Sequence, residues 1–111
     1  MSSSRIAAAA AALTLITAGT ASAQDAAAGA KVFADQKCAL CHSVAGKGNA
    51  KGPLDDVGSK LSAADIRSWI DDAPGMTAKT GATRKPAMKA YSLPKGDVDA
   101  LVAYLTTLKK K

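Results

Sequence analysis

Hydrophobic residues recur at helical spacing near the end of the chain. They are separated by three or four positions and would share one face of a helix: Val98, Leu101, Val102, Leu105 and Leu108. Pro94 precedes them, and proline is well suited to the first turn of a helix. The pattern therefore predicts a closing helix that starts just after Pro94 and buries this face.

The segment after position 60 carries a well-marked helix start. Ser62 and Asp65 form a pair resembling a capping box, and Leu61 and Ile66 are placed to form the hydrophobic staple beside it. The apolar positions that share one face of this helix are Ile66, Trp69 and Ile70. The Pro74-Gly75 pair predicts where the helix ends.

The remaining segments divide into one more helix and two loops. An alanine-rich stretch from Asp25 to about Asp35 predicts a first helix, with the acidic Asp25 near its positive end. Glycine and proline punctuate residues 46–59 and 76–93, which predicts irregular loops there. No segment reads as a strand, so the sequence predicts an all-α fold of three or four helices with long loops.

The first 23 residues have the pattern of a secretory signal peptide. A short start with one positive charge, Arg5, is followed by an apolar run over residues 6–18 and by Ala-Ser-Ala at 21–23, which resembles a cleavage site. The run is shorter than the roughly 20 apolar residues that span a bilayer. We expect cleavage after Ala23, export to the periplasm, no stable membrane insertion, and one mature domain over residues 24–111.

The composition gives this domain few large apolar side chains for a core. Hydrophobic residues make up 48% of the chain, but many of them are alanine and only 4% of the residues are aromatic. Domains of this length are marginal without disulfides, a metal or some other staple. We therefore expect something other than side chains to fill the middle of the core.

Both cysteines and the only histidine lie in one pentapeptide, Cys38-Ala39-Leu40-Cys41-His42. A disulfide here would close too short a loop to stabilise the chain much. Thioredoxin-like redox chemistry occurs in an alternating strand and helix pattern, which this chain lacks. A structural zinc site needs four nitrogen or sulfur ligands, and the chain has only three cysteine and histidine residues. C-x-x-C-H is instead the signature of covalent c-type haem attachment. Thiols three positions apart lie on one side of a helical turn, where both can form thioethers with the haem vinyl groups, and His42 follows as the proximal iron ligand.

The chain resembles the class I cytochromes c over nearly the whole of its mature part. The resemblance rests on GAKVF, with Gly29 and Phe33, and on the segments CALCH, GPLDDVG, IRSWI, RKPAMKAY and LVAYL. It implies the small all-α cytochrome c fold, in which the first and last helices cross and one covalently bound haem c fills the core. It also implies an electron-transfer protein and not an enzyme.

The resemblance further implies a methionine as the second axial ligand of the iron. In the family this methionine lies in a loop shortly before the last helix, often beside a proline, as Met88 does in KPAM. Met76 follows the middle helix too closely, and the other role for either methionine is that of flexible core filler. A neutral thioether opposite an imidazole favours ferrous iron and raises the reduction potential.

Other pocket residues follow from the resemblance alone. The carbonyl of Pro53 would accept a hydrogen bond from the second ring nitrogen of His42. Trp69 would pack beside the haem on the methionine side or simply fill the core. The remaining expected lining residues are Leu54, Tyr91 and Leu93. Tyr104 would pack near Gly29 where the first and last helices cross.

The charge balance adds an expectation about partners. The formal net charge is +6, and removal of Arg5 with the leader would leave 14 basic residues against 9 acidic residues, a charge of +5. Lys37, Lys85 and Lys89 lie near the expected haem site, where they would steer docking to an acidic redox protein or simply keep the protein soluble. No basic stripe interleaved with aromatic residues indicates nucleic-acid binding.

We therefore expect a monomeric carrier with one haem c that passes single electrons between larger redox proteins. Three alternatives stay open at this point. The chain could be the haem c subunit or domain partner of a periplasmic dehydrogenase, an open-iron enzyme of the peroxidase type, or a haem protein that binds small ligands. Iron ligation by Met88 is the feature that opposes the last two.

Overall fold

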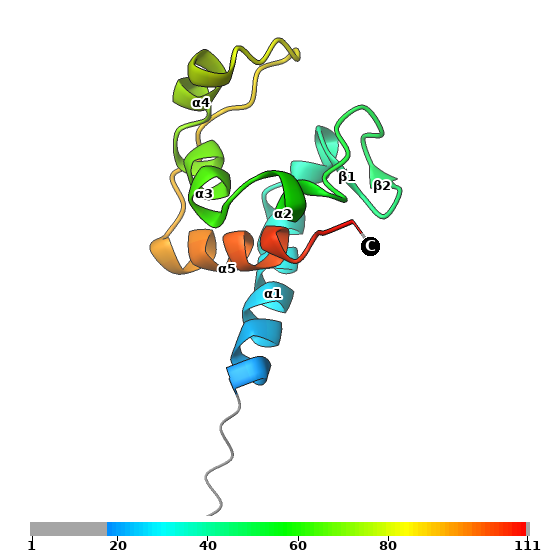
Figure 1. Ribbon diagram of the computed structural model, residues 1–111, viewed down its shortest axis with the longest axis vertical. Coiled ribbons are helices and arrows are strands. Elements are labelled where there is room, and N and C mark those ends of the chain that lie inside the picture. The colour runs from blue at the N-terminus through cyan, green and yellow to red at the C-terminus, as the bar shows by residue number, and fades with distance from the viewer. Residues whose placement is uncertain (1–17, 111) are drawn as a thin grey trace, which may run out of the picture.

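The computed structural model describes residues 18–110, so most of the expected signal peptide lies outside the described residues. The described part is mostly helical, as predicted, and adds a two-stranded sheet (Figure 1). Its elements are α1 (Ala18–Asp35), the 3-10 turn η1 (Cys38–Leu40), β1 (Ser43–Val44), β2 (Lys47–Gly48), α2 (Val57–Lys60), α3 (Ala63–Asp71), α4 (Ala73–Thr80) and α5 (Lys95–Thr106). Within residues 18–110, no helix combines the length and apolarity needed to cross a bilayer.

Helix α1 starts earlier than the sequence predicted. It runs from Ala18 and not from Asp25, so Asp25 does not lie in its first turn. Alanine has the highest helix propensity of all residues, and the alanine-rich stretch lets the helix extend toward the N-terminus. The end of α1 buries Phe33, and Val32 packs partly against the same core.

Helix α5 confirms the periodicity of the closing segment. It follows Pro94, which stands at its N-cap. Four of the five predicted apolar residues are buried within the helix: Val98, Leu101, Val102 and Leu105. Leu108 lies beyond the last helical residue and packs partly against the same core.

The two terminal helices cross, with α5 running over α1 at a steep angle (Figure 1). At the crossing, a Cβ atom on Gly29 would collide with the carbonyl oxygen of Ala100 and with Cβ of Tyr104. Beside it, the rings of Phe33 and Tyr104 meet edge to face, with centroids 5.8 Å apart and planes 65° apart. The expected contact between Tyr104 and Gly29 is thereby confirmed, because only a residue without a side chain allows this approach.

Helix α3 begins as its capping pattern predicted. The hydroxyl of Ser62 accepts a hydrogen bond from the backbone N–H of Asp65 at 3.1 Å. Ile66 and Ile70 are buried on the inner face of the helix, and Leu61 packs partly against the same core. This helix therefore contributes one wall of the core between α1 and α5.

Helix α4 corrects the prediction that residues 76–93 form a single loop. Helix α3 ends at Asp71, and Asp72 then caps a new helix by accepting a hydrogen bond from the backbone N–H of Gly75. Pro74 lies in the first turn of α4, where its missing N–H has no intrahelical partner to lose. The helix ends at Gly81, whose φ of 69° is readily adopted by glycine.

The expectation that the chain has no strand was wrong for one short hairpin. Strands β1 and β2 pair antiparallel through a two-residue turn at Ala45 and Gly46, with φ of 51° and 79°. Positive φ at both central residues is characteristic of a type I′ hairpin turn. Two residues per strand are too few to show alternation in the sequence. Helix α2 likewise adds one helical turn within the predicted loop 46–59.

Candidate functional site

A cavity of about 590 Å³ lies in the middle of the core. This volume is typical of sites for cofactors and other small molecules. Apolar side chains from α1, α3 and α5 form much of its wall: Phe33, Ile66, Trp69, Ile70, Leu101 and Leu105. The structure thus has, at its centre, the space that the thin apolar composition of the sequence led us to expect.

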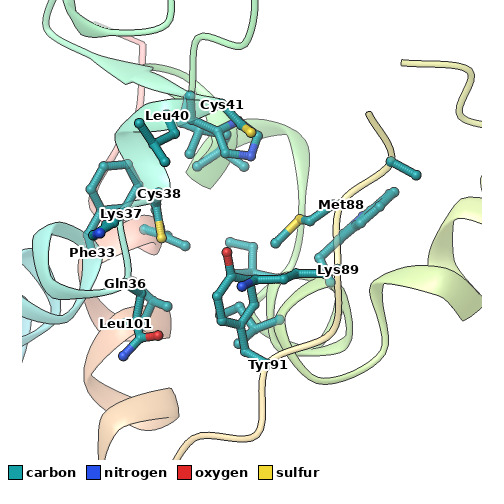
Figure 2. A pocket seen from close by; sticks show the side chains of 18 of the residues that line it. Phe33, Gln36, Lys37, Cys38, Leu40, Cys41, Met88, Lys89, Tyr91 and Leu101 are labelled. Atoms are coloured by element: carbon teal, nitrogen blue, oxygen red, sulfur yellow. The ribbon is translucent and has the colours of Figure 1, made fainter. Parts of the chain in front are cut away.

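The CALCH segment forms one edge of the cavity. The backbone N–H groups of Cys41 and His42 both donate to the carbonyl of Cys38, at 3.1 and 2.9 Å, which closes the turn. Both thiols are free, and Cys38 is half-buried while Cys41 is exposed. Figure 2 shows the two sulfur atoms at the border of the cavity. Burial raises the pKa of the Cys38 thiol, so before attachment it is protonated near neutral pH.

The imidazole of His42 is oriented by the backbone of the following loop. Its Nδ1 lies 3.1 Å from the carbonyl oxygen of Gly52. A carbonyl oxygen can only accept, so Nδ1 carries the hydrogen and Nε2 keeps a free lone pair. This is the tautomer that a metal-ligating histidine needs.

The acceptor is Gly52 and not Pro53, which corrects the expectation from the resemblance. Around Pro53 the chain is bridged to β1, where Ser43 donates to the carbonyl of Gly52 at 3.0 Å and accepts from the N–H of Leu54 at 2.8 Å. Successive carbonyls of an extended chain point in opposite directions. The carbonyl of Gly52 therefore faces β1 and His42, and that of Pro53 faces away. Pro53 is not among the residues that line the cavity.

Electrostatics favour a neutral imidazole at this position. Burial lowers the pKa of His42, the hydrogen bond to Gly52 raises it by a smaller amount, and the positive charge of Arg84 lowers it further. The net effect is a pKa below the ordinary value for histidine. The ring is therefore uncharged near neutral pH and available as a nitrogen ligand.

The two candidate methionines lie in different environments. Met88 lies in the segment between α4 and α5, is half-buried and lines the cavity. Figure 2 shows its sulfur directed into the cavity, across from Cys38 and Cys41. Met76 lies in α4, is only 9% exposed and is not among the lining residues. Of the two, the structure brings only Met88 together with the CALCH segment.

The other predicted pocket residues also meet at the cavity. Leu54, Trp69, Tyr91 and Leu93 all line it. Tyr91 is held by its backbone N–H, which donates to the carbonyl of Ile70 at 2.9 Å. The ammonium group of Lys89 lies 5.1 Å from the centre of the Tyr91 ring, within cation–π distance. Burial raises the pKa of the Tyr91 phenol, which stays protonated near neutral pH.

Two residues at the site could not be identified as site residues from the sequence. Arg84 lines the cavity and donates a hydrogen bond to the carbonyl oxygen of Cys41, 43 positions earlier in the chain. Leu40, between the two cysteines, is 71% exposed although it is large and apolar. The contact of Arg84 with Cys41 depends on how two loops that are far apart in the sequence meet. A local pattern of residues does not encode such a meeting.

The residues around the cavity fit a covalently bound haem. Two free thiols border it, an imidazole is held with Nε2 available, and a thioether enters from another segment. The walls are mainly apolar and aromatic, as a porphyrin face requires, and cationic residues such as Lys37 and Lys89 lie among the lining residues. Cys38 and Cys41 would hold the group, and His42 would ligate its iron.

A search against protein-family models matches residues 26–109 to the Cytochrome c family. The chain belongs to the cytochrome c family. Members of this family bind haem c covalently and are typically electron carriers, so the predicted cofactor and fold class are confirmed. Comparison with curated proteins and with solved structures returned no significant match.

Proposed function

We propose that this cytochrome c is a one-electron carrier between larger redox proteins, with His42 and Met88 as the two axial ligands of its haem iron. The observation that carries the proposal is that Met88 and the CALCH segment line the same cavity, with the sulfur of Met88 directed into it (Figure 2). Haem c supplies an iron that gains and loses one electron.

The residues of the site would then have separate roles. His42, held by Gly52, would present Nε2 without rotating, and Met88 would supply a soft neutral sulfur that favours the ferrous state. Apolar walls such as Phe33 and Leu101 exclude water. Because both residues would stay in place in either oxidation state of the iron, the protein would rearrange little.

The same arrangement favours a carrier over the open-iron alternatives. A peroxidase or a ligand-binding haem protein needs a free position on the iron. Met88 would occupy that position from the side opposite His42. The carrier proposal and these alternatives therefore differ in whether Met88 ligates the iron, and replacing Met88 tests this.

We also propose that the partner docks where the cavity reaches the surface and presents an acidic face. Lys37 and Lys89 line the cavity and are exposed, and Lys85 is exposed in the same segment as Met88. Leu40 adds an exposed apolar contact beside the cysteines. Cations around an apolar centre would steer an acidic redox protein toward the haem at low ionic strength. We propose that the carrier acts as a monomer.

Export to the periplasm completes the proposal. The positive start, the short apolar run and the Ala-Ser-Ala sequence at 21–23 support removal of residues 1–23. Cleavage after Ala23 would shorten α1 but would keep Gly29 and Phe33, which contact α5. The mature chain would then comprise residues 24–111.

The test of the proposed ligation is the pair of variants Met88→Ala and Met76→Leu. Met88→Ala should abolish the weak far-red absorption band of methionine-bound ferric iron, lower the reduction potential, and let carbon monoxide bind the ferrous protein rapidly. Met76→Leu conserves the volume of a buried side chain outside the cavity and should keep the band. An unchanged far-red band in Met88→Ala would eliminate Met88 as the ligand.

A further inference from the structure

The segment that carries Met88 has few attachments to the rest of the molecule. Residues 83–90 form neither helix nor strand, and among residues 18–110 no backbone hydrogen bond joins them to another segment. The backbone bonds that bracket the segment are those from Ala82 to Thr77 and from Tyr91 to Ile70. Of residues 83–90, all but Met88 are exposed. Segments of this kind open locally at low cost in free energy.

One side chain ties this segment to the opposite side of the site. The guanidinium of Arg84 donates to the carbonyl oxygen of Cys41, and it is the only hydrogen bond described for residues 83–90. The group also lies against the backbone of Gly52, since a Cβ atom there would collide with Nη1 and Cζ of Arg84. Arg84 therefore contacts both the turn that carries the cysteines and the loop that orients His42.

We propose that Arg84 is a positioning residue that pins the segment carrying Met88 to the haem-attachment turn, and so sets how readily Met88 gives way to an outside ligand. This inference rests on the proposed ligation by Met88. It assigns to Arg84 a role that acts through the methionine and not through contact with the iron.

The distance along the chain makes this coupling direct. Met88 follows Arg84 by four positions, and a fully extended stretch of that length reaches roughly 14 Å at most. With Arg84 bound to Cys41, Met88 stays within a short radius of the CALCH turn. Without this bond, the nearest hydrogen-bonded positions on either side of Met88 are Ala82 and Tyr91, and the segment between them gains conformational freedom.

The role also depends on the shape of the guanidinium. Its planar fork places one nitrogen on the carbonyl of Cys41 while another lies over Gly52. A lysine ammonium is a point charge that can reach one acceptor but cannot cover both groups. Arg84→Lys should therefore hold the segment that carries Met88 less firmly than the wild type does, but more firmly than Arg84→Gln.

The test uses the purified haem-loaded protein and imidazole as an outside ligand of ferric iron. Arg84→Gln should bind imidazole about tenfold more tightly than the wild type, the effect expected for loss of one charge-assisted hydrogen bond that holds the methionine segment. Its far-red band should also fade at a lower temperature. Lys79→Gln removes the same charge from the exposed surface of α4, away from the cavity, and should bind imidazole as the wild type does.

Each outcome bears on the inference. Equal imidazole affinity in Arg84→Gln and Lys79→Gln would overturn it while leaving the proposed function intact. A wild-type protein that lacks the far-red band would overturn both, because Met88 would then not be a ligand. If Arg84→Gln does not accumulate with haem, Arg84→Lys is measured instead. An affinity for imidazole that exceeds that of the wild type by less than tenfold supports the inference, and an affinity equal to that of the wild type overturns it.

Discussion

Nδ1 of His42 lies 3.1 Å from the carbonyl oxygen of Gly52, and this hydrogen bond fixes the plane and the tautomer of the imidazole. The carbonyl is itself held in place, because it also accepts from the N–H of Ser43 at 3.0 Å. The N–H of Gly52 donates to the carbonyl of Asn49 at 3.1 Å. The orientation of His42, the proposed iron ligand, is thus determined by a loop ten residues further along the chain.

Replacing Gly52 by alanine tests the importance of this loop. The added Cβ would collide with the carbonyl oxygen of Cys41 and the guanidinium of Arg84, so the loop that orients His42 must shift. We expect a loss of about 1–3 kcal/mol in the free energy of unfolding of the haem-loaded protein, measured by urea denaturation. As a control, Gly96→Ala adds the same methyl group where no atom lies within 4 Å, and it should be neutral or stabilising.

The crossing of α1 and α5 gives a second prediction. Gly29→Ala would place a Cβ against the carbonyl of Ala100 and Cβ of Tyr104, and would force the two helices apart. We expect a destabilisation of about 1–3 kcal/mol in the urea midpoint analysis, although alanine is the better helix former. If Gly29→Ala were as stable as Gly96→Ala, the two helices would not be packed as closely as described here.

Local patterns predicted much of the fold because their physical causes are local. The apolar period of α5 and the capping pair Ser62 and Asp65 depend on neighbours within one or two turns, and both were confirmed. The errors arose where one residue is compatible with two local structures. Pro74 was interpreted as a helix end, but it also suits the first turn of the helix that Asp72 caps.

The site was predictable only in part for a different reason. Cys38, Cys41 and His42 share a pentapeptide whose spacing suits thioether attachment, so the sequence was sufficient to assign the cofactor. The contacts of Gly52 with His42 and of Arg84 with Cys41 depend on how separate loops meet. Such meetings are set by the whole fold, and no spacing along the chain encodes them.

The ion pairs of Asp99 predict a dependence of stability on pH. Hydrogen bonds from Lys95 and then Arg67 lower the pKa of the Asp99 carboxyl in the folded protein. A carboxyl with a lowered folded pKa stabilises the protein above its unfolded pKa of about 3.9, and this contribution is lost as the pH falls through the folded pKa.

Asp99→Asn should therefore be less stable than the wild type at pH 7, and the difference should shrink below about pH 3.9. Urea denaturation of both proteins at pH 7 and at pH 3 measures this change. Asp71→Asn removes the same charge from the exposed end of α3, where residues 18–110 provide no ion pair for it, and should show no loss at pH 7. A constant deficit for Asp99→Asn at both pH values would contradict the ionic explanation.

The proposed docking surface predicts a dependence on ionic strength. Oxidation of the ferrous protein by ferricyanide, an anion, should be slowed roughly twofold or more at low salt by Lys37→Gln combined with Lys89→Gln. The difference should fade above about 0.15 M salt, where the Debye length is about 8 Å. Stopped-flow spectroscopy follows the reaction. Lys79→Gln with Lys109→Gln removes equal charge away from the haem cavity and should have a clearly smaller effect.

The central claim is that one haem is attached covalently through Cys38 and Cys41. The most direct measurement is the intact mass of the denatured protein after export and purification from a host that matures c-type cytochromes. We predict a single species with the mass of residues 24–111 plus one haem. A folded, purified chain with the mass of the bare polypeptide would contradict the account.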